Sequence, residues 1–250
     1  MLWIINGKRI KNIILIMIAA FFAALILFVQ KQETSVFTPI QSNGALSKIV
    51  TNQKHIALTF DINWGDQQLP LILKTLNEEH VKATFFISGE WAERYPNLVR
   101  SIAKSGHEIE SHGMHHEDYT QIEIKRVRSD ILFGRETIYK SLGERPNMIR
   151  PPYGNINKAV LEQAHALNQQ VVLWSVNPRD ETNPGYKTIV HRVLQQTGRG
   201  DIIKLHASDI AKSTNRALPL IIRELENRGY TFVPLKSLIS DTRSNSKLMD

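Results

Sequence analysis

The chain has 250 residues, of which 42% are hydrophobic and 22% are charged, and this is the composition of a globular protein with one sizeable core. Its net charge of +7 is not gathered into a dense basic run, which argues against a nucleic-acid partner and favours attraction to anionic surfaces such as a membrane or a cell wall. The absence of cysteine excludes disulfide bonds and thiolate metal sites. We expect a monomer.

The N-terminal region has the pattern of a membrane anchor. An uncharged apolar run from Ile13 to Val29 follows three basic residues, and it is apolar on every face. The run is at the short end of the length that spans a bilayer as a helix. We therefore expect residues 1–31 to be a cytoplasmic tip and single-pass transmembrane signal anchor, with everything after Lys31 outside the cell membrane. A cleaved signal peptide is the alternative, but no Ala-x-Ala site follows the run.

Three further regions follow the anchor. Residues 32–53 are polar and without periodicity, which predicts a linker. Residues 54–240 alternate between short apolar runs and segments of helical periodicity, and residues 241–250 form a polar tail. The expected strands are 56–60, 83–87, 108–111, 148–149, 171–174, 201–205 and 230–233. The expected helices are 69–79, 91–104, 122–142, 158–167, 187–196 and 216–228.

This alternation predicts parallel β/α units with buried strands. The expected fold class is therefore α/β, a distorted (β/α) barrel of about seven strands preceded by the transmembrane helix.

Polar residues stand where several of these strands end. They are Asp61 after the first strand, His112 and His116 after the third, Arg150 after the fourth, Asp180 in the loop that follows Trp174, and His206 at the end of the sixth. In a β/α barrel the carboxyl ends of the strands converge on one face, where active sites lie. The sequence therefore predicts that these side chains form one site.

The two histidines after the third strand have the spacing of a metal-ligand pair. Imidazole is the commonest protein ligand for zinc, and residues four apart can present their rings to one ion. A pair of solvated loop histidines is the alternative interpretation. The other polar residues at the strand ends favour the metal site.

Five blocks of the sequence, in order, resemble the polysaccharide deacetylases of the NodB homology type, carbohydrate esterase family 4. The blocks are Thr59-Phe60-Asp61, His112-x-x-x-His116, Arg150-Pro151-Pro152-Tyr153-Gly154, Asp180 and Leu205-His206. The resemblance covers roughly residues 53–240. The anchor, the variant block from Phe60 to Asp66 and the run His206-Ala207-Ser208-Asp209 are most similar to the sporulation-associated PdaB-like subgroup.

The resemblance implies a metal-dependent hydrolase, with zinc the expected divalent ion, that removes acetyl groups from an N-acetylated cell-wall polysaccharide of the peptidoglycan type. It implies that Asp61 is the general base and His206 the general acid. Arg150 would fix a carboxylate, and Asp180 would orient Arg150 or His206. The backbone N–H of Tyr153 would stabilise the oxyanion.

The remaining expected contacts concern the substrate and the metal. The resemblance implies that Leu205 lines a pocket for the acetyl methyl group, and we expect Trp174 and Pro152 beside the sugar. His112 and His116 would be metal ligands.

The sequence departs from the family pattern at three positions. Ile62 stands where the family has a second aspartate that binds the metal, so Asp66 or a water would have to replace that ligand. Glu181 stands where an aromatic residue is usual, and Asn177 where many relatives have an acid.

These departures leave three hypotheses open. One is an active deacetylase, another is a non-catalytic glycan-binding protein on the same fold with a structural role in wall or spore formation, and the third is a different metal-dependent hydrolase. Ile62 favours the binding protein. The intact set of Asp61, Arg150, Asp180 and His206 favours the deacetylase.

Overall fold

Seven parallel strands form the centre of the structure, a computed structural model that describes residues 17, 20, 21 and 44–246. The strands are β1 (His55–Ile62), β2 (Thr84–Ile87), β3 (Glu108–Ser111), β4 (Met148–Ile149), β5 (Gln170–Val171), β6 (Ile202–His206) and β7 (Thr231–Phe232). Their order in the sheet is β5-β4-β3-β2-β1-β6, and β7 pairs with the first residues of β1. The predicted α/β class with parallel strands is confirmed.

The sheet is curled, so its two outer strands approach each other. An isolated bridge joins Val176, in the chain after β5, to Ile203 of β6. The chain that leaves one end of the sheet therefore pairs with the strand at the other end. This arrangement is consistent with a distorted (β/α) barrel.

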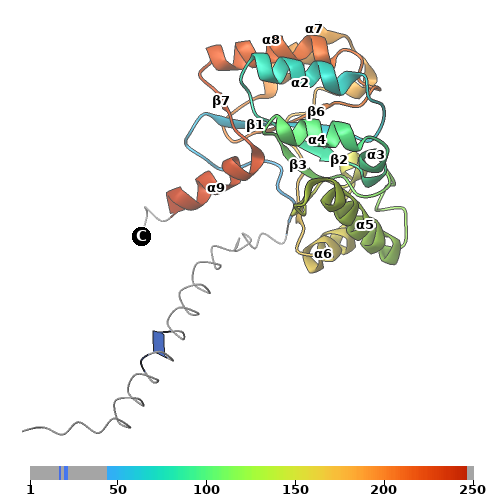
Figure 1. The fold of residues 1–250 in the computed structure, drawn as a ribbon. Helices are drawn as coiled ribbons and strands as arrows, with labels where there is room; N and C mark the ends of the chain where they lie inside the picture. Colours follow the sequence, from blue (N-terminus) through green and yellow to red (C-terminus); the bar gives the residue numbers. More distant parts are fainter. Residues whose placement is uncertain (1–16, 18–19, 22–43, 247–250) are drawn as a thin grey trace, which may run out of the picture. The chain divides into compact units, whose positions relative to one another are not determined.

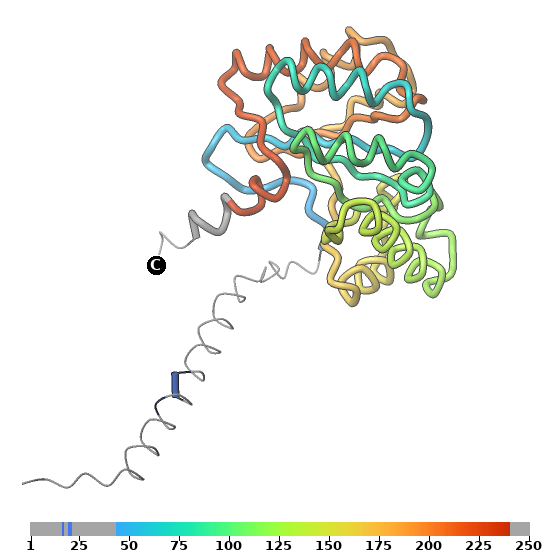
Figure 2. The backbone as a smooth tube through the Cα atoms, viewed as in Figure 1, coloured from blue at the N-terminus to red at the C-terminus, as the bar shows by residue number. Residues whose placement is uncertain are grey.

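Helices surround the strands. They are α2 (Gln68–Glu78), α3 (Gly89–Arg94), α4 (Pro96–Lys104), α5 (Ile124–Leu142), α6 (Lys158–Ala166), α7 (Tyr186–Gln196), α8 (Thr214–Asn227) and α9 (Leu235–Ser246). In Figure 1, α2, α7 and α8 lie together on one side of the strands and α5 and α6 on another. Helix α8 packs against both α2 and α7, although α2 is far from it in the sequence (Figure 2).

Successive residues of β1 face opposite sides of the sheet, as the pleat requires. One set packs in the main core between the sheet and the helices: Ile56, Leu58, Phe60 and Ile62. Ala57 instead belongs to a smaller cluster with Phe86 of β2, Met148 of β4 and Ile202 of β6. Because members of this inner cluster come from strands around the curl, the cluster lies on the concave side of the sheet.

The same alternation decides which residues of β6 face the site. Ile203 and Leu205 pack in the main core, whereas Ile202 belongs to the inner cluster. Lys204 and His206 therefore share the inner face with Ile202.

Helix α9 completes the inner cluster with Leu235 and Leu238. The Lys236 ammonium lies 2.8 Å from Oε1 of the buried Glu110, which ties the helix to β3. Because α9 follows β7, which pairs with the start of β1, it packs at the end of the barrel opposite His206. The predicted domain boundary at residue 240 falls inside this helix.

Two other expectations differ from the structure. The helix expected over 91–104 is two helices, because Pro96 lacks a backbone N–H and starts α4 instead of continuing α3. Part of the expected linker belongs to the fold, since Leu46 bridges to Val172 and Ile49 is buried.

Most of the expected anchor, Ile13–Val29, lies outside the described residues, as do residues 32–43 and 247–250. Among the helices that the structure describes, none has the length and apolar character needed to cross a bilayer.

Candidate active site

A buried ion pair links β1 to the residue after β4. Arg150 is fully buried, and its Nη1 donates to Oδ1 of Asp61 over 2.7 Å. Its other donors reach the carbonyl oxygens of Val172 and Leu173, at 3.4 and 3.0 Å. Burial alone would raise the pKa of Asp61, but the charges of Arg150 and of three further basic side chains together outweigh it, and the pKa lies below its usual range. Asp61 is therefore ionised at neutral pH, as a general base must be.

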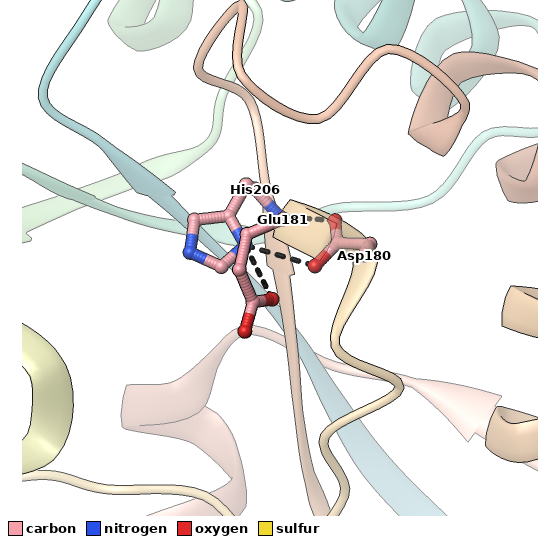
Figure 3. A group of neighbouring side chains, drawn as sticks. All are labelled: Asp180, Glu181 and His206. Atoms are coloured by element: carbon pink, nitrogen blue, oxygen red, sulfur yellow. Dashed lines mark hydrogen bonds and ion pairs between the residues drawn. The ribbon is translucent and has the colours of Figure 1, made fainter. Parts of the chain in front are cut away.

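A second carboxylate holds His206 at the end of β6 (Figure 3). The Nδ1–H of His206 donates to Oδ1 of Asp180 over 2.8 Å, and its backbone N–H donates to Oδ2 over the same distance. Thr214 also donates to Oδ2, at 2.7 Å. Burial would lower the pKa of His206, but the hydrogen bond and charge of Asp180 raise it above the usual value. His206 is thus suited to donate a proton.

The described residues contain one group of three ligand-type side chains with donor atoms within 4.8 Å of one another, namely Asp180, Glu181 and His206. Nδ1 of His206 lies 3.7 Å from Oε2 of Glu181 as well as 2.8 Å from Asp180 (Figure 3). A metal bound there would have to displace the hydrogen bond between His206 and Asp180. We interpret the group as a histidine held by the Asp180 carboxylate, with the Glu181 carboxylate nearby.

The predicted histidine pair has the properties of metal ligands. Nδ1 of the buried His112 lies 2.6 Å from the Arg150 carbonyl oxygen, to which it donates, and this leaves Nε2 as the ring atom that can bind a metal. The ring of His116 lies 5.1 Å from that of His112. Burial lowers the pKa of His112 to about 4 and also lowers the pKa of His116. Both rings are therefore neutral near pH 7, the form that binds metals.

Asp130 of α5 holds the loop that carries this pair. Its carboxylate accepts hydrogen bonds from the backbone N–H groups of Met114 and His115, both at 2.9 Å, and from the Tyr119 hydroxyl at 2.6 Å. Gly113 has φ +78°, and a Cβ there would lie 2.5 Å from Oδ2 of Asp130. The loop position thus depends on a residue that the sequence analysis did not single out.

The turn after Arg150 lies beside the histidines. Tyr153 has φ 61° and ψ −6°, a conformation that is strained for a residue other than glycine and is common at functional sites. Its ring lies 4.4 Å from the ring of His116. A Cβ on Gly154 would lie 2.3 Å from Cη2 of Trp174, so Trp174 packs directly on this turn. Pro152 is buried in the turn.

Two predicted site residues and Ile62 lie away from this group. Leu205 is fully buried in the main core on the face of β6 opposite His206, which does not agree with its expected contact with the acetyl group. Ile62 likewise faces the helices. Asp66 is exposed, and it belongs to no three-ligand group with the two histidines in the described part of the chain.

The loops after β1 and β6 are joined by polar contacts. The Asp209 carboxylate accepts hydrogen bonds from the backbone N–H groups of Asp66, Gln67 and Gln68 at the start of α2. Ser208 donates to the side chain of Asn63 over 2.8 Å. These contacts fix the loop after Asp61 relative to the loop after His206.

Lys204 is a residue of the site that the sequence analysis missed. It is 6% exposed, and its Nζ lies 4.0 Å from the centroid of the Trp174 ring. The sequence shows it only as one polar residue within an apolar strand. Its spacing of two from His206 is the signal that could have placed it on the inner face.

Comparisons with known proteins identify the family. A family model described as polysaccharide deacetylase matches residues 48–172. A peptidoglycan-N-acetylglucosamine deacetylase of Bacillus cereus is 38% identical over 195 residues, which are 77% of this chain and 91% of that protein. The peptidoglycan-N-acetylmuramic acid deacetylase PdaC of Bacillus subtilis is 36% identical over 187 residues. These residues are 75% of this chain and 39% of PdaC.

A solved structure shares the fold. It is a mutant of a CE4 family pseudoenzyme in which enzymatic activity has been restored. The two chains are 25% identical and superpose with a TM-score of 0.76, and the match covers 80% of this chain and 72% of the other. The family model, the relatives and the strand-end site agree. The chain belongs to the polysaccharide deacetylase family.

Proposed function

We propose that this protein hydrolyses the N-acetyl group of an amino sugar in peptidoglycan. The observation that carries the proposal is the pairing of Asp61 with His206 on neighbouring strands β1 and β6. Arg150 favours the ionised form of Asp61, and Asp180 raises the pKa of His206. The relatives named as peptidoglycan deacetylases support the substrate class.

The proposed reaction uses these two groups in turn. Asp61 takes a proton from water as the water oxygen bonds to the acetyl carbon, and the carbonyl π electrons move to the oxygen. His206 then donates its proton to the amide nitrogen as the C–N bond breaks, which releases acetic acid and a free amine. The acid passes its hydroxyl proton to the amine, so the final products are acetate and an ammonium group, and the proton on Asp61 returns to His206. Because its low pKa makes Asp61 a weak base, the carbonyl must also be polarised by positive charge.

The family implies a divalent metal, and the donors present fit such an ion only in part. His112 and His116 supply two neutral imidazoles, but no third protein ligand accompanies them among the described residues. A bound ion would polarise the acetyl carbonyl. We propose that zinc, where present, is held by these histidines more weakly than by a complete three-ligand set.

We further propose that residues 1–31 anchor the protein in the cell membrane, with the deacetylase domain on the outer side beside the wall glycan. The apolar run and the basic residues before it support this placement. The PdaB-like sequence blocks support a role in sporulation.

The test is acetate release by the purified full-length protein. N-acetylglucosamine oligomers and muropeptides are supplied separately, and mass spectrometry detects the loss of an acetyl group from the sugar. Acetate from either substrate supports the proposal and identifies the sugar. A folded protein that releases no acetate from any wall glycan contradicts it.

A glycan-binding protein without activity is the second candidate. Ile62 stands where the family has a metal ligand, and no third ligand accompanies His112 and His116 among the described residues, which favours this candidate. The likeness to a structure derived from a pseudoenzyme favours it as well. Binding of the same oligomers without acetate release would establish this alternative.

A further inference from the structure

Lys204 is a buried cation that the proposed reaction leaves without a role. It is 6% exposed, and no carboxylate in the described part of the chain forms an ion pair with it. The register places it beside Thr59 of β1, one inner-face position before the pair formed by Asp61 and His206. Its side chain therefore starts directly below the two proposed proton-transfer groups.

The position of the ammonium is fixed by an aromatic ring. Nζ lies 4.0 Å from the centroid of Trp174, and Trp174 itself packs on the backbone of Gly154. Within the described residues Nζ is held by this cation–π contact and by no ion pair, and it is not sealed from solvent. The ammonium therefore remains available to an anion that enters the site.

Neighbouring groups show where such an anion would lie. Lys204 is close enough for its charge to act on Asp61, His116 and His206. The Asp61 carboxylate is already bound by Arg150 at 2.7 Å. A negative charge that forms between these side chains during the reaction would meet the Lys204 ammonium without competition from an internal ion pair.

We propose that Lys204 is a further catalytic residue whose ammonium stabilises the oxyanion formed when water adds to the acetyl carbonyl. The inference rests on the proposed function and extends it. The oxyanion receives the carbonyl π electrons and keeps no proton, so Lys204 stays charged throughout. When the carbonyl reforms and the C–N bond breaks, His206 protonates the nitrogen and acetic acid forms. The acid then passes its hydroxyl proton to the released amine, and the acetate remains paired with Lys204 until it leaves.

Kinetics of the full-length protein test the proposal. Lys204→Met and Lys204→Gln each remove the charge, and Lys204→Arg retains it. We expect kcat to fall about 100-fold to 1000-fold in the first two variants, with KM changed less than about threefold, and to be partly retained in the third. A kcat within about threefold of the parent in both neutral variants, with folding confirmed by near-UV circular dichroism, would overturn it.

Lys54→Met is the matched control. Its ammonium also lies over an aromatic ring, 5.6 Å from the centroid of Tyr230, but it precedes β1 and so lies at the other end of the strand from Asp61. We expect its kinetics to equal those of the parent.

Acetate binding supplies a readout that needs no turnover. Acetate is titrated into the parent, Lys204→Gln and Lys54→Met and followed by NMR, and we expect affinity to fall at least about tenfold only in Lys204→Gln. Equal acetate affinity in all three would overturn the inference. If acetate binding depends on Lys204 but no glycan releases acetate, the anion site at Lys204 is supported and the proposed deacetylation is contradicted.

Discussion

Arg150 organises the site through two separate groups. Its guanidinium pairs with Asp61, and its carbonyl oxygen accepts from Nδ1 of His112. One buried residue therefore favours the ionised form of the base and orients a proposed metal ligand. The expectation that Arg150 fixes a carboxylate is consistent with this geometry.

Asp61→Asn should abolish acetate release and also reduce stability. The substitution leaves the Arg150 charge buried without its partner, which costs about 3 kcal/mol of unfolding free energy. Urea denaturation and acetate release measure the two effects. Glu162→Gln is the control, because it removes a carboxylate from the exposed pair with Lys158 and should change neither. An Asp61→Asn variant as stable as the parent would show that the pair contributes nothing.

Asp180→Asn should move the alkaline limit of activity to lower pH. His206 must be protonated to act as an acid, and Asp180 raises its pKa above 6.5. The parent gains stability from this pair that is complete below pH 6.5 and is lost as pH rises through the raised pKa of the folded state. The pH dependence of kcat and an NMR titration of His206 measure the shift. If the alkaline limit of activity is the same in Asp180→Asn as in the parent, a group other than His206 sets that limit.

At the scale of elements, the predicted strands could place the polar residues at strand ends, but they did not say which way each side chain faces. The family blocks fix where Leu205 and Ile62 stand in the sequence, whereas the alternation along β6 and β1 turns both toward the helices. The same alternation turns Lys204 inward. Asp130 and Asp209 were beyond prediction because each acts on backbone amides of a distant segment.

Ile62→Asp should destabilise the protein and fail to create a tighter metal site. The new carboxylate would be buried among apolar side chains, at a cost of about 3 kcal/mol or more, and it would point away from His112. Urea denaturation and zinc calorimetry provide the measurements, with Ile62→Val as the control at about 1 kcal/mol. Tighter zinc binding at unchanged stability would show that residue 62 faces the histidines.

At the scale of the whole molecule, the regular alternation of apolar runs was enough to predict the parallel α/β fold. The extent of the fold was harder to predict, because Leu46 and α9 have weak local patterns and are held by partners far away in the sequence. Leu46 bridges to Val172, and Leu238 joins the inner cluster. Such contacts have no signature in a local stretch of sequence.

Removal of residues 1–31 should transfer the protein from the membrane fraction to the supernatant. The apolar run contains the only proposed anchor, and the rest of the chain carries ordinary globular composition. Fractionation of cells that express the full and shortened chains measures the change. Continued membrane association of the shortened chain would mean that a second segment binds the bilayer.

The Asp209 carboxylate has a consequence for protein engineering. It holds three successive amides of the segment that leads into α2, while Ser208 holds Asn63 in the same segment. The segments 63–68 and 208–209 thus form one transplantable module although they are separated by most of the domain. A chimera that receives either segment alone from a relative should lose the helix cap, whereas one that receives both together should keep it.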